Sequence, residues 1–157
     1  MTSTIDLQLL DDKAQILHVM HEAFARYKDD AIPSSALSET VQSLQQEMQA
    51  GVEVFGTMQH NEIIAIVKVA QKMDKLYFSR LSVLPIYQGQ GVASALVNEL
   101  VQIAQLKGLP IIQCKVRKSE RANIALYEKL GYKIVSEEET VSKTGFSMPT
   151  VTMEKWI

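Results

Sequence analysis

Val-Leu-Pro-Ile-Tyr-Gln-Gly-Gln-Gly-Val-Ala, residues 83–93, runs directly into an apolar segment that begins at residue 94. The pattern is typical of a strand end, a tight glycine-bearing loop and the start of a helix. Gly89 and Gly91 allow backbone N–H groups to turn inward, and the helix adds unpaired N–H donors and the positive end of its dipole. Such a loop suits a phosphate or pyrophosphate, although glycines at a strand-to-helix turn also occur for steric reasons alone.

The composition is that of one globular domain. With 157 residues and 46% hydrophobic side chains, the chain is large enough to bury a core, so we expect residues 1–157 to form a single domain. A formal net charge of −2 gives no general attraction to nucleic acid or to an anionic membrane, and we expect neither partner. The single cysteine, Cys114, excludes an intrachain disulfide and argues against a cysteine metal site. The N-terminus lacks a signal-peptide pattern, so we expect a cytoplasmic protein. We also expect no bound metal.

Apolar periodicity divides the first half of the chain into a strand, two helices and a β-hairpin. Asp11-Asp12 supplies capping chemistry for the first helix, Pro33 breaks the chain, and Ser38 is positioned to cap the second helix. Four polar residues between the last two β-rich runs predict an antiparallel connection. The expected elements are a strand over 4–10, helices over 12–28 and 38–50, and strands over 52–58 and 63–72.

The second half alternates strands and helices before it ends in two strands. Ser119 is positioned to cap a helix, and Gly131 to follow its last turn. The expected elements are strands over 76–83, 111–116, 132–141 and 148–156, and helices over 92–107 and 119–130. This order predicts an α/β fold of the α+β type, with a mixed sheet of about seven strands flanked on both faces by about four helices.

Two motifs in this order resemble the GNAT superfamily of N-acetyltransferases. Residues 88–93, Gln-Gly-Gln-Gly-Val-Ala, are similar to the family's pyrophosphate signature, Gln/Arg-x-x-Gly-x-Gly/Ala, and stand between the fourth strand and the third helix. Residues 126–132, Leu-Tyr-Glu-Lys-Leu-Gly-Tyr, are similar to the family's Leu-Tyr-Glu-Lys-Leu-Gly-Phe. The resemblance covers the whole chain in topology, but the motifs lie mainly within residues 76–135.

The resemblance implies that acetyl-CoA binds in a V-shaped opening between the strands over 76–83 and 111–116. Backbone amides of the glycine loop would hold the pyrophosphate, and the edge of residues 81–83 would pair with the amides of the pantetheine arm, as a strand edge binds a peptide. The implied cofactor-binding residues are Leu81, Val83, Gln88, Gly89, Gln90, Gly91, Val92, Ala93, Ser94 and Tyr127, to which Asn123 is added as a candidate.

The sequence departs from the family pattern at two places. Members commonly carry Asn seven residues before the helix tyrosine, where this chain has Glu120. Asn123 shares a helical face with Tyr127, and it either takes over a cofactor contact or is an ordinary exposed residue. Some members also place a glutamate early in the fourth strand, and residues 76–79 contain no carboxylate. The general base is therefore not identified; His18, His21, Glu22, Tyr27, Glu53 and a water chain are the candidates.

Tyr127 is the candidate catalytic residue. The proposed reaction is direct attack of an amine on the acetyl thioester, for which Tyr127 acts either as the general acid or as a hydrogen-bond donor to the departing thiolate. Reference pKa values of about 10 for Tyr and about 8.5 for a thiol make full proton transfer uphill by roughly 2 kcal/mol. The alternative is a tyrosine that merely packs against the sheet.

The resemblance therefore indicates an acetyl-CoA-dependent N-acetyltransferase that acts on a primary amine of a small molecule or a peptide. The alternative is a catalytically silent acyl-CoA-binding or regulatory module; a P-loop nucleotide site lacks the required Gly-Lys-Ser/Thr. Two charged groups stay open: the bases at 115, 117, 118 and 121 either follow the CoA nucleotide or are solvated, and Glu137–Glu139 is either solvated or attracts a cationic acceptor. The apolar end of the chain, residues 150–157, predicts a strand that pairs with a second copy in a homodimer.

Overall fold

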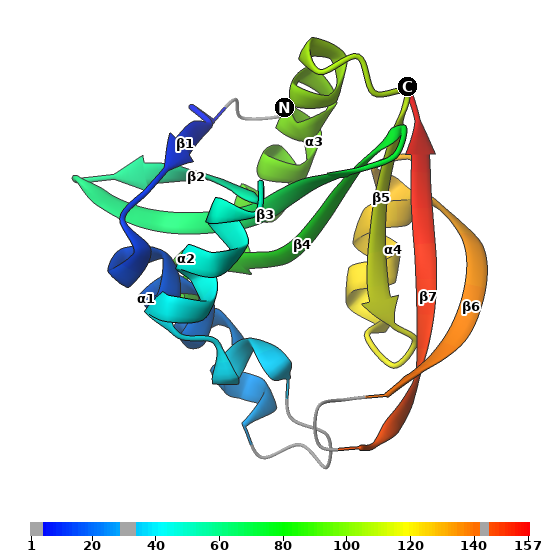
Figure 1. Ribbon diagram of the computed structural model, residues 1–157, viewed down its shortest axis with the longest axis horizontal. Coiled ribbons are helices and arrows are strands. Elements are labelled where there is room, and N and C mark those ends of the chain that lie inside the picture. Colours follow the sequence, from blue (N-terminus) through cyan, green and yellow to red (C-terminus); the bar gives the residue numbers. More distant parts are fainter. Residues whose placement is uncertain (1–4, 29–33, 142–144) are drawn as a thin grey trace.

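The computed structural model describes residues 5–28, 34–141 and 145–157 (Figure 1). Its strands are β1 Gln8–Leu10, β2 Glu53–Gln59, β3 Glu62–Lys72, β4 Lys75–Val83, β5 Ile111–Arg117, β6 Lys133–Val141 and β7 Ser147–Trp156. Its α-helices are α1 Lys13–Phe24, α2 Val41–Gln49, α3 Val92–Leu106 and α4 Arg121–Lys129, and its 3₁₀ turns are η1 Ala25–Tyr27, η2 Ser35–Ser38 and η3 Pro85–Tyr87. None of the helices in the described part of the chain is both long and apolar enough to cross a bilayer.

The seven strands form one mixed, open sheet in the order β1-β2-β3-β4-β5-β7-β6. β4 and β5 are parallel, and every other neighbouring pair is antiparallel. Sequence periodicity predicted the order of elements, the mixed sheet and the four helices, and all three are confirmed. The parallel pair matters for the site because α3 provides the crossover from β4 to β5.

Each face of the sheet is covered by helices over a separate core cluster. On one face, Ile16 and Met20 of α1 and Leu44 of α2 are fully buried with Val54 of β2. On the other face, Leu96 and Leu100 of α3 and Tyr127 of α4 pack on β4 and β5. The buried residues of these two strands include Leu76, Phe78 and Ile112. Figure 1 shows α1 and α2 in front of the sheet, with α4 behind β5 and β7.

Several predicted element ends are corrected. β1 is shorter than expected because three residues, Gln8–Leu10, pair with β2. Asp12 caps α1 as predicted, through a 3.1 Å bond from the Gln15 amide. Ser38 does not cap α2: it ends the turn η2, and Thr40 is the cap, exchanging bonds with Ser43. The start of the first strand at Thr4 and the break at Pro33 lie outside the described residues.

The prediction that Ser119 caps the fourth helix is also wrong. Glu120 occupies the position before α4, and no side-chain cap bond is formed there. Gly131 does follow the last turn of α4 with a positive φ of 99°, as expected. The side chain of Glu120 is thereby free of a capping role, which bears on the site described below.

The predicted role of the last strand at a subunit interface is contradicted. β7 lies between β5 and β6, and residues 150–154 pair with both neighbours, so this segment has no free edge. β1 and β6 are the edge strands of the described sheet. These two strands, and not β7, are the outer edges to which a second copy could add a strand.

β4 and β5 separate partway along their length. They pair at three positions, from Lys75 with Ile111 to Tyr77 with Gln113. Beyond these positions β4 continues against β3 while β5 continues against β7, and the two ribbons splay apart in Figure 1. The described sheet thus has the V-shaped opening that the sequence predicted between these two strands.

Candidate active site

The loop that joins β4 to α3 has the geometry of an anion cradle. Gly89 and Gly91 have φ values of 78° and 81°, in the left-handed region that favours glycine. A Cβ built at either position would meet no atom within 4 Å, so the backbone faces open space. Gly91 directly precedes α3, where the first amides lack helical partners. The loop therefore fits a phosphate or pyrophosphate.

Gln88 joins the glycine loop to the end of β4. Its side-chain amide donates a 2.9 Å hydrogen bond to the carbonyl of Val83. Gln90 reaches back in a similar way, with 3.4 Å from its side-chain amide to the carbonyl of Ile86. The side chains of both glutamines thus brace the loop, and a bound anion would meet the backbone of residues 88–93 rather than these amides.

A β-bulge shapes β4 where it leaves β5. Ser79 faces Lys68 and Ser82 faces Ile66, so Arg80 and Leu81 together stand opposite a single residue of β3. Arg80 has a φ of 56°, and the Ser82 hydroxyl donates to its carbonyl over 2.8 Å. Bulges bend a strand and re-aim its side chains, and they are common beside active sites. Here the bulge lies at the open side of the V, ahead of the glycine loop.

Two adjoining cavities occupy the opening. The cleft cavity, about 240 Å³, lies between the bulge and β5 and reaches Ser34, Ser35 and Met148. The loop cavity, about 150 Å³, leads from there along Val83 toward Gln88 and Ala93. Both are lined by Phe24, Tyr27, Leu81, Asn123 and Tyr127. We call these five residues the seam, because they line both cavities.

Tyr127 stands at this seam. Its ring is 6% exposed and packs edge-on against Phe78, with centroids 5.6 Å apart. Burial raises the pKa of Tyr127 far above its ordinary value, so the hydroxyl stays protonated and is available to donate a hydrogen bond. Leu81, Val83 and Asn123, which the sequence predicts to bind the cofactor, line the loop cavity with it.

Most candidate bases lie away from the seam. His18 and Glu22 are exposed, and His21 is engaged through Nε2 at 3.0 Å from the Glu39 carbonyl. Glu53 pairs with Lys107 over 2.7 Å. Of the five side chains considered, Tyr27 lines the cavities, but burial, and next the Glu120 carboxylate, raise the pKa of its hydroxyl. A tyrosine with a raised pKa is a poor proton acceptor.

Several of the basic residues at 115–121 and acidic residues at 137–139, whose roles the sequence left undecided, form polar contacts with one another or with neighbouring residues. Lys115 pairs with Glu138 over 2.9 Å and Lys118 with Glu137 over 2.8 Å, while Glu139 accepts a bond from Ser147. The acidic run is therefore bound up along β6 and its neighbours. Lys115 and Arg117 also line the cleft cavity.

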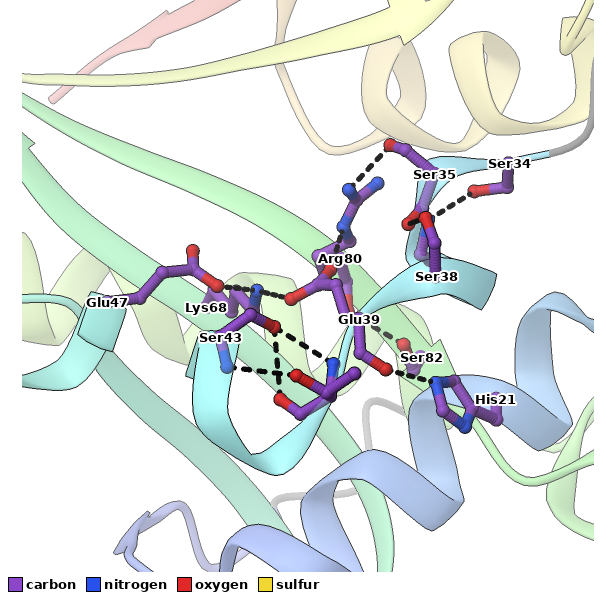
Figure 2. A network of polar contacts seen from close by, with 12 residues as sticks. His21, Ser34, Ser35, Ser38, Glu39, Ser43, Glu47, Lys68, Arg80 and Ser82 are labelled. Atoms are coloured by element: carbon purple, nitrogen blue, oxygen red, sulfur yellow. Dashed lines mark hydrogen bonds and ion pairs between the residues drawn. The ribbon is translucent and has the colours of Figure 1, made fainter. Parts of the chain in front are cut away.

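A buried ionic network, which sequence reasoning missed, supports the bulge (Figure 2). Glu39 accepts a 2.7 Å bond from Nε of Arg80 and a bond from Lys68, and Lys68 also pairs with Glu47 over 2.6 Å. A second guanidinium nitrogen of Arg80 donates to the Ser35 hydroxyl over 2.8 Å. Burial alone would raise the pKa of Glu39, but Lys68 and Arg80 outweigh it and hold the pKa below its usual range.

The network fixes Arg80 in its left-handed conformation and ties β3 and β4 to η2 and α2. The signal in the sequence was Lys68, a charge inside the apolar run 63–72, since a buried cation needs a partner. The partner could not be identified because Glu39 lies 29 residues away, before α2. Among the described residues, no group of three His, Cys, Asp or Glu side chains is arranged to hold a metal.

These features define a protein class: an α/β domain with a split parallel strand pair, an anion-binding loop at the opening and a two-part cavity with a tyrosine at its seam. A family model, described as the acetyltransferase (GNAT) family, matches residues 17–132. Because this match covers most of the chain, the protein belongs to the GNAT acetyltransferase family.

Individual relatives agree with this membership. The ribosomal protein bS18-alanine N-acetyltransferase of Escherichia coli strain K12 is 32% identical over 78 residues, 50% of this chain and 53% of the relative. The chain thus spans about half the length of the curated relatives it matches. The crystal structure of the Escherichia coli ribosomal-protein-S18-alanine N-acetyltransferase superposes with a TM-score of 0.78 at 22% identity, over 97% of this chain and 93% of that one.

A second solved structure is that of a PaiA N-acetyltransferase from Thermoplasma acidophilum in complex with coenzyme A. It superposes with a TM-score of 0.76 at 18% identity, over 99% of this chain and 100% of that chain. At such identities the two structures show that the fold is shared.

Proposed function

We propose that the protein is an N-acetyltransferase that transfers the acetyl group of acetyl-CoA to a primary amine in a ternary complex. The observation that carries this proposal is the seam: the open edge of β4 leads from the glycine loop to Tyr127, where the loop cavity meets the cleft cavity. A thioester held along β4 would present its carbonyl there. Binding both reactants in one opening supplies much of the rate by proximity and orientation.

The residues for the acetyl donor are those that the family pattern implied. Backbone amides of residues 88–93, with the start of α3 at Val92 and Ser94, would hold the pyrophosphate. The edge of β4 from Leu81 to Val83 would pair with the pantetheine amides as an added strand would. Asn123 lines both cavities, which supports a contact between its side chain and the end of this arm.

The chemistry asks little of the side chains beyond orientation and hydrogen bonding. The amine nitrogen attacks the thioester carbonyl, and an edge N–H of β4, that of Val83, would stabilise the oxyanion as a preorganised donor. Tyr127 would then donate a hydrogen bond to the sulfur as the C–S bond breaks. Its raised pKa opposes complete proton transfer, so donation rather than general acid catalysis is its role in this proposal.

The acceptor we favour is the N-terminal amine of a peptide, with small-molecule amines as the second candidate. Support comes from the relatives whose names specify alanine N-acetylation of a ribosomal protein. The cleft cavity, about 240 Å³, extends along β5 to Met148, so it has room for more than an amino group. We further propose a cytoplasmic location, consistent with the single, buried Cys114.

Thiol release tests this function. Purified protein with acetyl-CoA would be offered peptides with free N-terminal alanine, serine or methionine, the free amino acids and spermidine, with mass spectrometry of each product. We expect a mass gain of one acetyl group on an amine nitrogen, with stoichiometric thiol. Acetyl-CoA binding without thiol release from any of these amines would favour the alternative, a silent acyl-CoA-binding module.

A further inference from the structure

The departure from the family pattern at residue 120 places a carboxylate inside the opening. Glu120 directly precedes α4, and Asn123 and Tyr127 follow at three and seven residues, which puts all three on one helical face. All three line the cleft cavity. The side chain of Glu120 is 25% exposed, so it is sheltered yet accessible from this cavity.

Across the opening, Glu120 faces the turn η1. The guanidinium of Arg26 lies 3.9 Å from its carboxylate and also donates to the Tyr27 hydroxyl. Arg26 lines the loop cavity, Glu120 the cleft cavity and Tyr27 both. Glu120 therefore lies on the acceptor side of the seam, next to the place where the amine must approach the thioester.

The other ionisable groups of the cleft cavity are poor proton acceptors. Burial raises the pKa of Tyr77 and Tyr127, raises that of Tyr27 together with Glu120, and raises that of the Cys114 thiol to about 12. Such groups keep their protons near neutral pH. The remaining cavity-lining groups that titrate are cationic, and Glu120 carries the one carboxylate among the described residues that line this cavity.

We propose that Glu120 is the proton acceptor of the reaction, a role that rests on the proposed function. A primary ammonium in the cleft cavity gives one proton to the Glu120 carboxylate, which passes it to water. The neutral amine attacks the acetyl carbon, the C–S bond breaks, and the second proton leaves the nitrogen for the thiolate. The products are the amide, the CoA thiol and one released proton, so the step balances.

Other charged and titratable side chains lie beside Glu120 or line the same cavity. They are Arg26 and Tyr27 of η1, Arg80 and Tyr77 of β4, Lys115 and Arg117 of β5, and Tyr127 of α4. Because the ammonium is the group that must lose a proton, removal of Glu120 has its largest effect where the amine is mainly protonated.

Glu120→Gln tests the assignment, with a peptide amide that begins with alanine as the probe, or the fastest amine of the panel above. An N-terminal amine has a pKa of about 8, so most of it is protonated at pH 7. We expect kcat/KM to fall at least tenfold at pH 7, with the difference narrowing above pH 8.5, while the Kd for acetyl-CoA stays unchanged. Glu120→Asp should keep more of the rate than Glu120→Gln.

Glu128→Gln is the matched control, since Glu128 is an exposed carboxylate on the same helix and its loss gives the same change in net charge. It should match the wild type at every pH. Equal rates for Glu120→Gln and the wild type, or a loss that is the same at every pH, would overturn the assignment. These outcomes require a wild-type protein that turns over. No thiol release from any amine, with or without acetyl-CoA binding, would refute the proposed function itself and the assignment with it.

Discussion

At the scale of single residues, Tyr127 and Tyr132 belong to the same aromatic cluster, but their hydroxyl groups have different surroundings. The rings of Tyr127 and Tyr132 lie 5.9 Å apart, and both pack against Phe78. Tyr127 faces the cavities, whereas the hydroxyl of Tyr132 is buried without a hydrogen-bond partner among the described residues. The hydroxyl of Tyr127 is therefore accessible to a bound ligand, whereas the unpaired hydroxyl of Tyr132 destabilises the fold.

Tyr127→Phe should lower kcat by about tenfold to a hundredfold and change the Kd for acetyl-CoA by less than threefold. The reason is that a hydrogen bond to developing charge stabilises the transition state more than the bound thioester. Steady-state thiol release and isothermal titration give the two quantities. An unchanged kcat would leave Tyr127 as a packing residue.

Tyr132→Phe is the matched control for this variant, since it removes the same atom from the neighbouring ring. It should leave kcat unchanged and raise the free energy of unfolding by about 1 kcal/mol, because an unpaired buried hydroxyl is removed. Urea denaturation provides the measurement. A loss of activity equal to that of Tyr127→Phe would indicate that the whole cluster, rather than one hydroxyl, supports turnover.

At the scale of elements, the loop before α3 makes the anion site through its glycines. Gly91→Ala should lower the free energy of unfolding by about 1 to 2 kcal/mol, because residue 91 has a left-handed conformation that alanine adopts only with strain. It should also weaken acetyl-CoA binding at least tenfold, because the new methyl group would stand where the backbone must approach the pyrophosphate. Gly108→Ala is the control: Gly108 has a φ of 69°, equally open surroundings and no part in the site. Equal affinities for the two variants would remove the loop from donor binding.

The network around Glu39 predicts a pH dependence of stability. Since the folded-state pKa of Glu39 lies below its ordinary value of about 4.3, its contribution is present above that value and is lost as pH falls through the folded pKa. Glu39→Gln should lower the free energy of unfolding by about 3 kcal/mol at pH 7. In this variant the free energy of unfolding should also decline less steeply than in the wild type between pH 5 and 3. Urea unfolding across this range tests it, with exposed Glu62→Gln as the control; an unchanged slope in Glu39→Gln would contradict the account.

At the scale of the whole molecule, local sequence patterns predicted most of the helices and strands. Elements with strong periodicity were predicted, and so was the hairpin at Gln59–Glu62, where His60 and Asn61 both take positive φ. The placement of β7 was not predicted, because a terminal hairpin can dock through either strand. The usable signal was the acidic run in β6, since charges mark an edge strand and leave the apolar partner inside.

The site divides in the same way. The proposed acetyl-donor half depends on a contiguous loop and one helix, so local motifs at residues 88–93 and 126–132 could predict it. The proposed acceptor half joins Tyr27 of η1, Arg80 of β4, Lys115 of β5 and Glu120, which precedes α4, across the V-shaped opening. No local pattern records which of these side chains meet, because that depends on where β4 and β5 separate and on the bulge at Arg80.

The central claim is that the opening between β4 and β5 binds acetyl-CoA, and isothermal titration of the intact protein measures this most directly. The account predicts one molecule of acetyl-CoA per chain with a Kd in the micromolar range, about a tenfold or greater loss of affinity in Gly91→Ala, and wild-type affinity in Gly108→Ala. Absence of heat of binding at millimolar acetyl-CoA with folded protein would contradict it.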